Sequence, residues 1–189
     1  MSMQKLGPYL AAASVALVMS MSGSYVKADD APDSRIVGTW IGTGTVETPP
    51  GTSPFIFTDL AAINPGGTLT ETNGAFNWHS SENPFLPPPL TVDYGEGYGV
   101  WKQLNDSRRF AFTFQRLLFA GANTPTTVYG RFFPGQHIGV ATIESVLELS
   151  ASDGLKGTFT FQLTNLSGDV VFAGKGTISF TRLKIQQPE

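Results

Sequence analysis

The sequence has no cysteine, only two histidines, and few charges, with 14% charged residues among 189. Without cysteine, the fold cannot rest on disulfides, and zinc sites built on thiolates are excluded. His79 and His137 lie far apart in the sequence, whereas a metal site usually needs three or four converging ligands. Each histidine is therefore predicted to be an ordinary loop residue, and no metal or other cofactor is expected.

The sequence also lacks catalytic motifs and clusters of positive charge. It contains no Gly-x-Ser-x-Gly elbow, no phosphate-binding glycine loop and no His-Glu-x-x-His pattern, so no catalytic residue is assigned. The formal net charge is −3, and lysines and arginines are scattered. Nucleic acid and anionic lipid are therefore not expected as partners, because both are bound through clustered positive charge.

The only long apolar run, residues 9–21, follows Lys5 and precedes a Val-x-Ala sequence ending at Ala28. This order is typical of a secretory signal peptide. The run is broken by serines and is too short for a membrane anchor, which needs about 20 apolar residues. We expect cleavage after Ala28, export to the periplasm or the medium, and one mature domain over 29–189 with no membrane span.

The mature part alternates apolar and polar residues with period two, which is typical of half-buried β-strands, and no segment has helical period. Eight strands are predicted, over 36–46, 55–57, 68–72, 97–104, 109–119, 138–149, 157–163 and 170–185. A ninth could lie at 127–129, inside the loop 121–136. Tight turns make consecutive strands antiparallel, so the sequence predicts an all-β fold, an eight- to nine-stranded antiparallel up-and-down β-barrel. A β-sandwich is the alternative.

The stretch 73–97 breaks this pattern because it is rich in proline, yet it contains aromatic residues such as Phe76, Trp78 and Phe85. It is predicted to be a long loop. It could cover a barrel mouth as a lid, or pack its own side chains at the surface.

Two short motifs lie near the ends of the mature chain: Gly38-Thr39-Trp40 on the first strand and Thr181-Arg182 on the last. Together they resemble the signature that closes the base of lipocalins and related calycin barrels. The resemblance implies that Gly38, Trp40 and Arg182 close the barrel, with the guanidinium over the indole. The helix-poor outline is also similar to allene oxide cyclases and dirigent proteins.

Fourteen phenylalanines, five tyrosines and three tryptophans are present, many on single strand faces. They could simply fill the barrel, or they could line an apolar pocket for a small hydrophobic molecule. The predicted ligand-binding residues are Trp40, Phe57, Tyr98, Trp101, Phe112, Phe114, Arg116, Phe161 and Phe172.

Arg116 is unusual because it shares a strand face with Phe110, Phe112 and Phe114. It could reach solvent at the rim, or it could lie in the cavity, where a buried charge needs an anionic partner. Glu144, Glu148 or a carboxylate ligand could provide one.

A secreted, lipocalin-like protein that binds a small hydrophobic ligand is the favoured function. The alternative is a barrel cyclase or isomerase acting on an apolar substrate, with Arg116, Glu144 and Tyr98 as candidate polar groups. A third is a structural domain that binds a protein partner. A lumen of roughly 300 Å³ or more would favour the first two.

Overall fold

The computed structural model describes residues 34–48, 54–74, 90–105, 108–151 and 153–184. The expected leader, His79 and the central part of the expected loop, 75–89, lie outside the described residues. All described elements belong to one unit, Ala31–Glu189.

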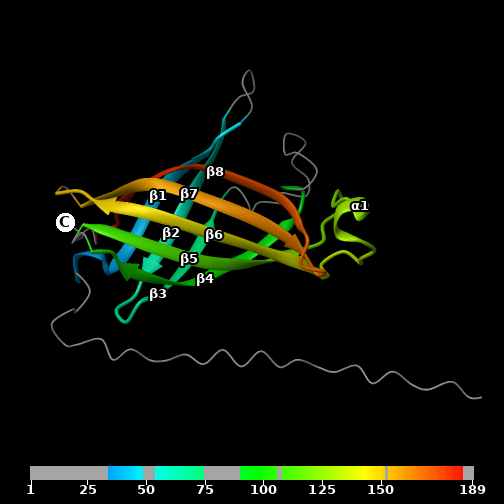
Figure 1. Cartoon of the computed structure of the whole chain (residues 1–189), viewed down its shortest axis with the longest axis horizontal. Helices are drawn as coiled ribbons and strands as arrows, with labels where there is room; N and C mark the ends of the chain where they lie inside the picture. Colours follow the sequence, from blue (N-terminus) through cyan, green and yellow to red (C-terminus); the bar gives the residue numbers. More distant parts are fainter. Residues whose placement is uncertain (1–33, 49–53, 75–89, 106–107, 152, 185–189) are drawn as a thin grey trace, which may run out of the picture. The chain divides into compact units, whose positions relative to one another are not determined.

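Eight antiparallel strands form a closed up-and-down barrel in which each strand pairs with its neighbours in the sequence (Figure 1). The strands are β1 (Gly38–Val46), β2 (Phe55–Ile63), β3 (Thr68–Asn73), β4 (Asp93–Gln103), β5 (Arg109–Phe119), β6 (His137–Leu149), β7 (Gly154–Asn165) and β8 (Val170–Arg182). The predicted fold class is confirmed, and the sandwich alternative is wrong.

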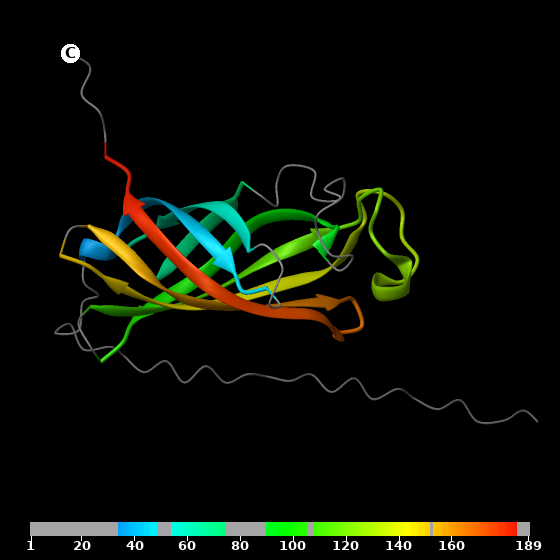
Figure 2. The same cartoon turned by 90° about the horizontal axis from the view of Figure 1, so that it is seen from above.

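The barrel closes where the first strand meets the last (Figure 2). β1 pairs with β8 from Trp40 opposite Arg182 to Val46 opposite Gly176, and its other edge pairs with β2. Closure leaves no strand of the barrel with an unpaired edge.

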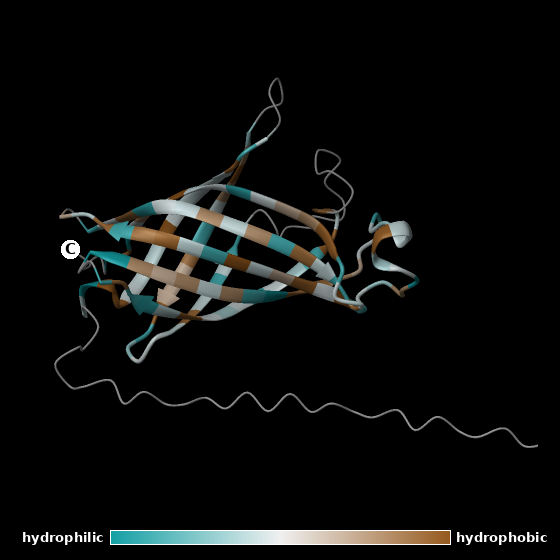
Figure 3. Cartoon of the chain, in the orientation of Figure 1, coloured by the Kyte–Doolittle hydropathy of each residue, from teal (hydrophilic) through white to brown (hydrophobic). Residues whose placement is uncertain are grey.

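Burial follows the period-two pattern of the sequence, and the banding of apolar and polar residues is visible along the strands (Figure 3). On β5, Phe110 and Phe112 are buried while Thr113 and Gln115 are exposed. On β1, Trp40 is fully buried and its neighbour Ile41 is exposed. Alternation of this kind turns one set of side chains into the barrel and the other outward.

Two segments differ from expectation. β4 begins at Asp93, not at 97, so the connection after β3 is shorter than the predicted loop 73–97. Tyr94 is buried, and this burial explains why the strand extends that far back. The expected ninth strand is instead a helical turn, α1 (Thr126–Tyr129), which follows Pro125, a residue favourable near a helix start.

The remaining helical element among the described residues is the short 3-10 turn η2 (Ser34–Ile36). Within those same residues, no helix has the length and apolar character needed to cross a membrane. η2 and α1 lie at opposite ends of the barrel (Figure 1).

Candidate ligand cavity

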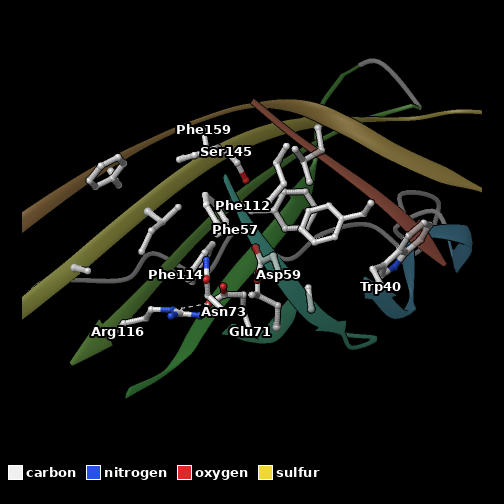
Figure 4. Close-up of a pocket in the computed structure, with 18 of the residues that line it drawn as sticks. Trp40, Phe57, Asp59, Glu71, Asn73, Phe112, Phe114, Arg116, Ser145 and Phe159 are labelled. Atoms are coloured by element: carbon white, nitrogen blue, oxygen red, sulfur yellow. Dashed lines mark hydrogen bonds and ion pairs between the residues drawn. The ribbon is translucent and has the colours of Figure 1, made fainter. Parts of the chain in front are cut away.

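The barrel encloses a cavity of about 80 Å³, well below the roughly 300 Å³ that would favour ligand binding or cyclisation. Aromatic rings fill much of the interior: Phe57 packs edge-on against Phe159 with 5.8 Å between ring centroids. The wall is mostly apolar, but polar side chains gather on one part of it (Figure 4). The polar lining residues with side-chain oxygen or nitrogen are Asp59, Glu71, Asn73, Tyr94, Arg116 and Ser145.

Most of the ligand-binding residues predicted from the sequence line this cavity. They are Trp40, Phe57, Phe112, Phe114, Arg116 and Phe161. Three others do not line it: Tyr98, Trp101 and Phe172. The structure therefore groups aromatic side chains from β1, β2, β5 and β7 around one space.

Tyr98 points away from the cavity, with 61% of its surface exposed, and its hydroxyl donates to Glu96 on the same outer face at 2.7 Å. This hydrogen bond to a carboxylate raises the pKa of the Tyr98 hydroxyl. A β-bulge between Tyr94 and Gly97 explains the orientation. The extra residue reverses the alternation, so Tyr94 points inward and Tyr98 outward. Its predicted place in the ligand site is wrong.

Trp101 and Phe172 serve packing instead. The Trp101 indole lies edge-on to Phe110, at 5.9 Å, and donates to the backbone oxygen of Asn64 at 3.0 Å. Phe172 is partly buried beside Phe161, with ring centroids 5.7 Å apart.

One end of the cavity is formed by Trp40, whose indole donates to the Ile36 oxygen of η2 at 2.9 Å. The Arg182 guanidinium lies 4.2 Å from the centroid of the indole, within cation–π distance. It also donates to the backbone oxygens of Val37, at 2.6 Å, and Arg35. Gly38 makes this approach possible, since a Cβ there would lie 2.5 Å from the Arg182 Nη1.

Arg116 lies at the other end of the cavity from Trp40 (Figure 4) and is only 3% exposed. Its Nε donates to Oε2 of Glu71 at 2.6 Å, and Nη2 lies 2.5 Å from the same oxygen. The interpretation that placed Arg116 inside the cavity is therefore confirmed, and escape to solvent is wrong. Its partner is Glu71, not Glu144 or Glu148, which are both exposed on β6.

Glu71 and Arg116 are on strands β3 and β5, with β4 between them. In the strand register Glu71 is opposite Gly97, and Gly97 is opposite Arg116. A Cβ at Gly97 would lie 2.6 Å from Oε2 of Glu71 and 2.9 Å from the Phe114 ring. Because glycine has no side chain, the acid and the base can meet across the strand that separates them.

Asp59 of β2 completes the polar cluster and is 4% exposed. Burial is the main cause that raises the pKa of the Asp59 carboxyl from 3.8 to about 10, and a hydrogen bond to Glu71 and the Glu71 charge raise it further. Arg116 acts in the opposite direction but does not compensate. Asp59 is therefore protonated at neutral pH, and the cluster holds one negative and one positive charge.

Three atoms of this cluster have no hydrogen-bond partner within the described part of the chain: Nη1 and Nη2 of Arg116, of which Nη2 lies in the ion pair with Glu71, and Oδ1 of Asp59. Buried polar atoms are normally paired, so each such atom requires an explanation. Both residues line the cavity, although these atoms are themselves buried within its wall.

The segment between β5 and β6 is tied to the start of β4 at the α1 end. Thr124 Oγ1 donates to the Thr91 oxygen at 2.7 Å, and Thr91 Oγ1 donates to the Asn123 oxygen at 2.9 Å. Burial raises the pKa values of the Tyr94 and Tyr129 hydroxyls, so both stay neutral. This end of the cavity thus holds no further charged group among the lining residues.

Over the residues that the structure describes, no group of three or more histidine, aspartate or glutamate side chains is arranged to hold a metal ion. His137 lies at the start of β6, and its Nε2 is 2.8 Å from the Gly139 oxygen.

Comparisons with known proteins add little to this geometry. No family model matches the chain, and no curated protein matches it. Among solved structures, the chain is similar to Rv2717c from M. tuberculosis, with 8% sequence identity and a TM-score of 0.37. That match covers 80% of this chain and 94% of the other.

Proposed function

We propose that this protein binds a small, largely apolar molecule inside the barrel, as the resemblance to lipocalins implies. The observation that carries the proposal is a buried polar cluster, with the ion pair of Arg116 and Glu71, among the residues that line an otherwise apolar cavity. An apolar space with a few converging polar groups is the usual form of a ligand site. A barrel used only as a scaffold has no need of a buried ion pair, because well-packed apolar side chains stabilise a core at least as well.

The size of the cavity limits the ligand. An apolar cavity of roughly 150 Å³ holds benzene, which has six non-hydrogen atoms, so by proportion a cavity of about 80 Å³ suits a molecule of about three or four. With at most about 1.5 kcal/mol of binding free energy per atom for tiny ligands, we expect dissociation constants in the micromolar to millimolar range.

Titration of isotope-labelled protein with n-butane and 1-propanol, which have four non-hydrogen atoms each, followed by NMR, tests this proposal. The Trp40 indole lines the cavity and the Trp101 indole does not, so the two N–H signals report binding and an internal control. We expect saturable shifts at Trp40 and little change at Trp101. No saturable shift with either compound would overturn the proposal.

A matched pair of variants places the binding in the barrel. Ala61 lines the cavity, and its neighbour Ala62 is outside it. Ala61→Leu should fill the space and abolish the Trp40 shifts, whereas Ala62→Leu should leave them in place. Equal binding by both variants would place the ligand elsewhere.

A second candidate, a barrel cyclase or isomerase, is favoured by one observation: the protonated carboxyl of Asp59 lies in the same buried cluster as Arg116. A neutral acid and a fixed cation in an apolar cavity can stabilise negative charge that develops on a substrate oxygen. Conversion of small epoxides or enones by the wild type, lost in Asp59→Asn but retained in Arg182→Lys, would support catalysis. No conversion over such a panel would favour binding alone.

We further propose that the chain is exported and cleaved after Ala28, on the strength of the leader pattern at 1–28. The intact mass of the protein recovered from the periplasm or medium tests this: it should correspond to a chain starting at Asp29. A full-length mass in the cytoplasm would contradict it.

A further inference from the structure

The open space of the cavity borders one part of its wall, on β5 and β6. Most residues that line the cavity are buried, and the half-buried ones are Phe114, Ile143 and Ser145. Side chains alternate between the two faces of a strand, and these three are on the inner face. Their accessible surface therefore faces the interior of the barrel, beside the Ser145 side chain.

Glycines on β8 explain why space is left at Ser145. In the strand register Phe159 is opposite Ser145 on one side and Gly176 on the other. A Cβ at Gly176 would lie 2.7 Å from the Phe159 ring, so this ring lies over the glycine backbone. Phe161 lies over Gly174 in the same way, again at 2.7 Å. The two rings thus occupy the space that side chains on β8 would need and leave room on the β6 side.

The Ser145 hydroxyl is a polar group that the chain itself does not use. It makes no hydrogen bond with any residue that the structure describes, and it is not one of the unpaired atoms that are buried inside the wall. Its cross-strand neighbours, Phe112 and Phe159, have no polar side-chain atom. Figure 4 shows Ser145 away from the ion pair of Arg116 and Glu71. Its O–H is therefore free to donate to a molecule in the cavity.

A count of hydrogen-bond donors separates the ligands that such a group can hold. The oxygen of a ketone or aldehyde accepts the Ser145 O–H and brings no donor of its own, so every donor is paired. An alcohol brings a second O–H. Two hydroxyls make one hydrogen bond between them, and the flanking phenylalanines leave the other donor unpaired. A carboxylate would place a negative charge among apolar side chains, which is strongly unfavourable.

We propose that Ser145 is the polar anchor of the cavity and that the ligand is a small neutral ketone or aldehyde. The carbonyl oxygen accepts a hydrogen bond from Oγ of Ser145, and the carbon atoms contact Phe114 and Ile143. This inference rests on the proposed function and names the polar contact and the ligand class of the same cavity.

Three probes with four non-hydrogen atoms each test the ligand class: acetone, 1-propanol and n-butane, titrated by NMR with the Trp40 and Trp101 signals as before. Acetone and 1-propanol both give up hydrogen bonds to water when they bind, so the extra donor of the alcohol distinguishes them. We expect acetone to bind about fivefold more tightly than 1-propanol. Equal or tighter binding of 1-propanol would overturn the carbonyl assignment and leave the proposed function standing. Absence of binding by all three would overturn both.

A variant of Ser145 tests the anchor directly. Ser145→Ala removes the hydroxyl and little volume, so it should weaken acetone binding about fivefold while n-butane binds as well as before or better. Ser179→Ala, on the exposed outer face of β8, is the matched control and should bind both probes like the wild type.

Unchanged acetone affinity in Ser145→Ala, or an equal loss for n-butane, would overturn the role of Ser145. If Ser145→Ala fails to fold, the comparison of acetone with 1-propanol on the wild type still decides the ligand class.

Discussion

Two arginines lie near opposite ends of the cavity, and the protein balances their charges in different ways. Arg182, near the Trp40 end, lies against an aromatic ring and donates to two backbone oxygens, with no acid involved. Arg116, at the other end, is buried against Glu71 and keeps one nitrogen unpartnered. The first arrangement is complete within the chain and closes the fold. The second leaves polar atoms unpaired within the wall of the cavity, among the residues that the structure describes.

Replacing Arg116 should lower the free energy of unfolding more than any other change at either end of the cavity. Arg116→Met leaves the shared negative charge of Glu71 and Asp59 buried without a cation, which should lower the free energy of unfolding by about 3–5 kcal/mol. Urea unfolding measures it.

An exposed pair on the outside of the barrel offers a matched control. Lys175 and Glu47 lie 3.0 Å apart with both side chains more than half exposed. Lys175→Met should cost about 0–1 kcal/mol. A similar loss for Arg116→Met would mean that the buried pair is not isolated from solvent as described.

The two ends should also differ in their dependence on pH. In the unfolded chain Asp59 releases its proton above pH 3.8, whereas in the native barrel it keeps the proton up to about pH 10. The native state therefore binds more protons between these values, and the stability present below pH 3.8 is lost progressively as the pH rises. The loss should continue across the neutral range, on the order of 1 kcal/mol per pH unit.

Urea unfolding at several pH values tests this with two variants. Asp59→Asn has no proton to release and should lack the slope. Arg182→Lys alters only the Trp40 end and should keep it. A wild-type curve as flat as that of Asp59→Asn would contradict the raised pKa of Asp59.

A smaller effect is expected from the glycine that lets Glu71 and Arg116 meet. Gly97→Ala places a methyl group against the carboxylate and the Phe114 ring and should cost about 1–3 kcal/mol. Gly95 is two residues earlier on β4, where the nearest atom to an added Cβ lies at 3.4 Å. Gly95→Ala should therefore be better tolerated in thermal or urea unfolding. The reverse order would show that the ion pair does not depend on the gap at Gly97.

The smallest effect should come from Arg182→Lys. Lysine keeps the positive charge over Trp40 but loses the two-pronged contact with backbone oxygens, so we expect a loss of about 1 kcal/mol. Binding of 1-propanol should not change. A strong loss of binding would mean that the Trp40 end shapes the ligand site as well as closing the barrel.

Much of the barrel could be predicted from local alternation. The faces of β1 and β5 follow directly from the order of apolar and polar residues, and Trp40 and Arg182 are direct partners in the strand register. Arg116 could be placed on the inner face for the same reason. Tyr98 lies three residues before Trp101 on β4, after the bulge, so alternation alone places the two on opposite faces and could not bring both into one cavity.

The partner of Arg116 depended on contacts between strands. Glu71 shares a face with the buried Leu69, and Asp59 shares one with Phe57, so the alternation held a signal that these acids point inward. Their meeting with Arg116 depends on which strands are neighbours and on their register. Neither the order of the strands nor their register can be read from the sequence of a single strand. Glu144 and Glu148, on the strand that follows Arg116, were therefore predicted as its partners.

The row from Glu71 through Gly97 to Arg116 has a consequence for how the barrel assembles. If β3 slipped by one residue against β4, Glu71 would turn outward, and the cation of Arg116 would be left alone in the interior. If β4 slipped by one residue against β5, a residue with a side chain would replace Gly97 opposite Arg116 and block its contact with Glu71. Misaligned barrels are therefore penalised at this point far more than a purely apolar wall would penalise them. The same charges thus also fix the alignment of three strands during folding.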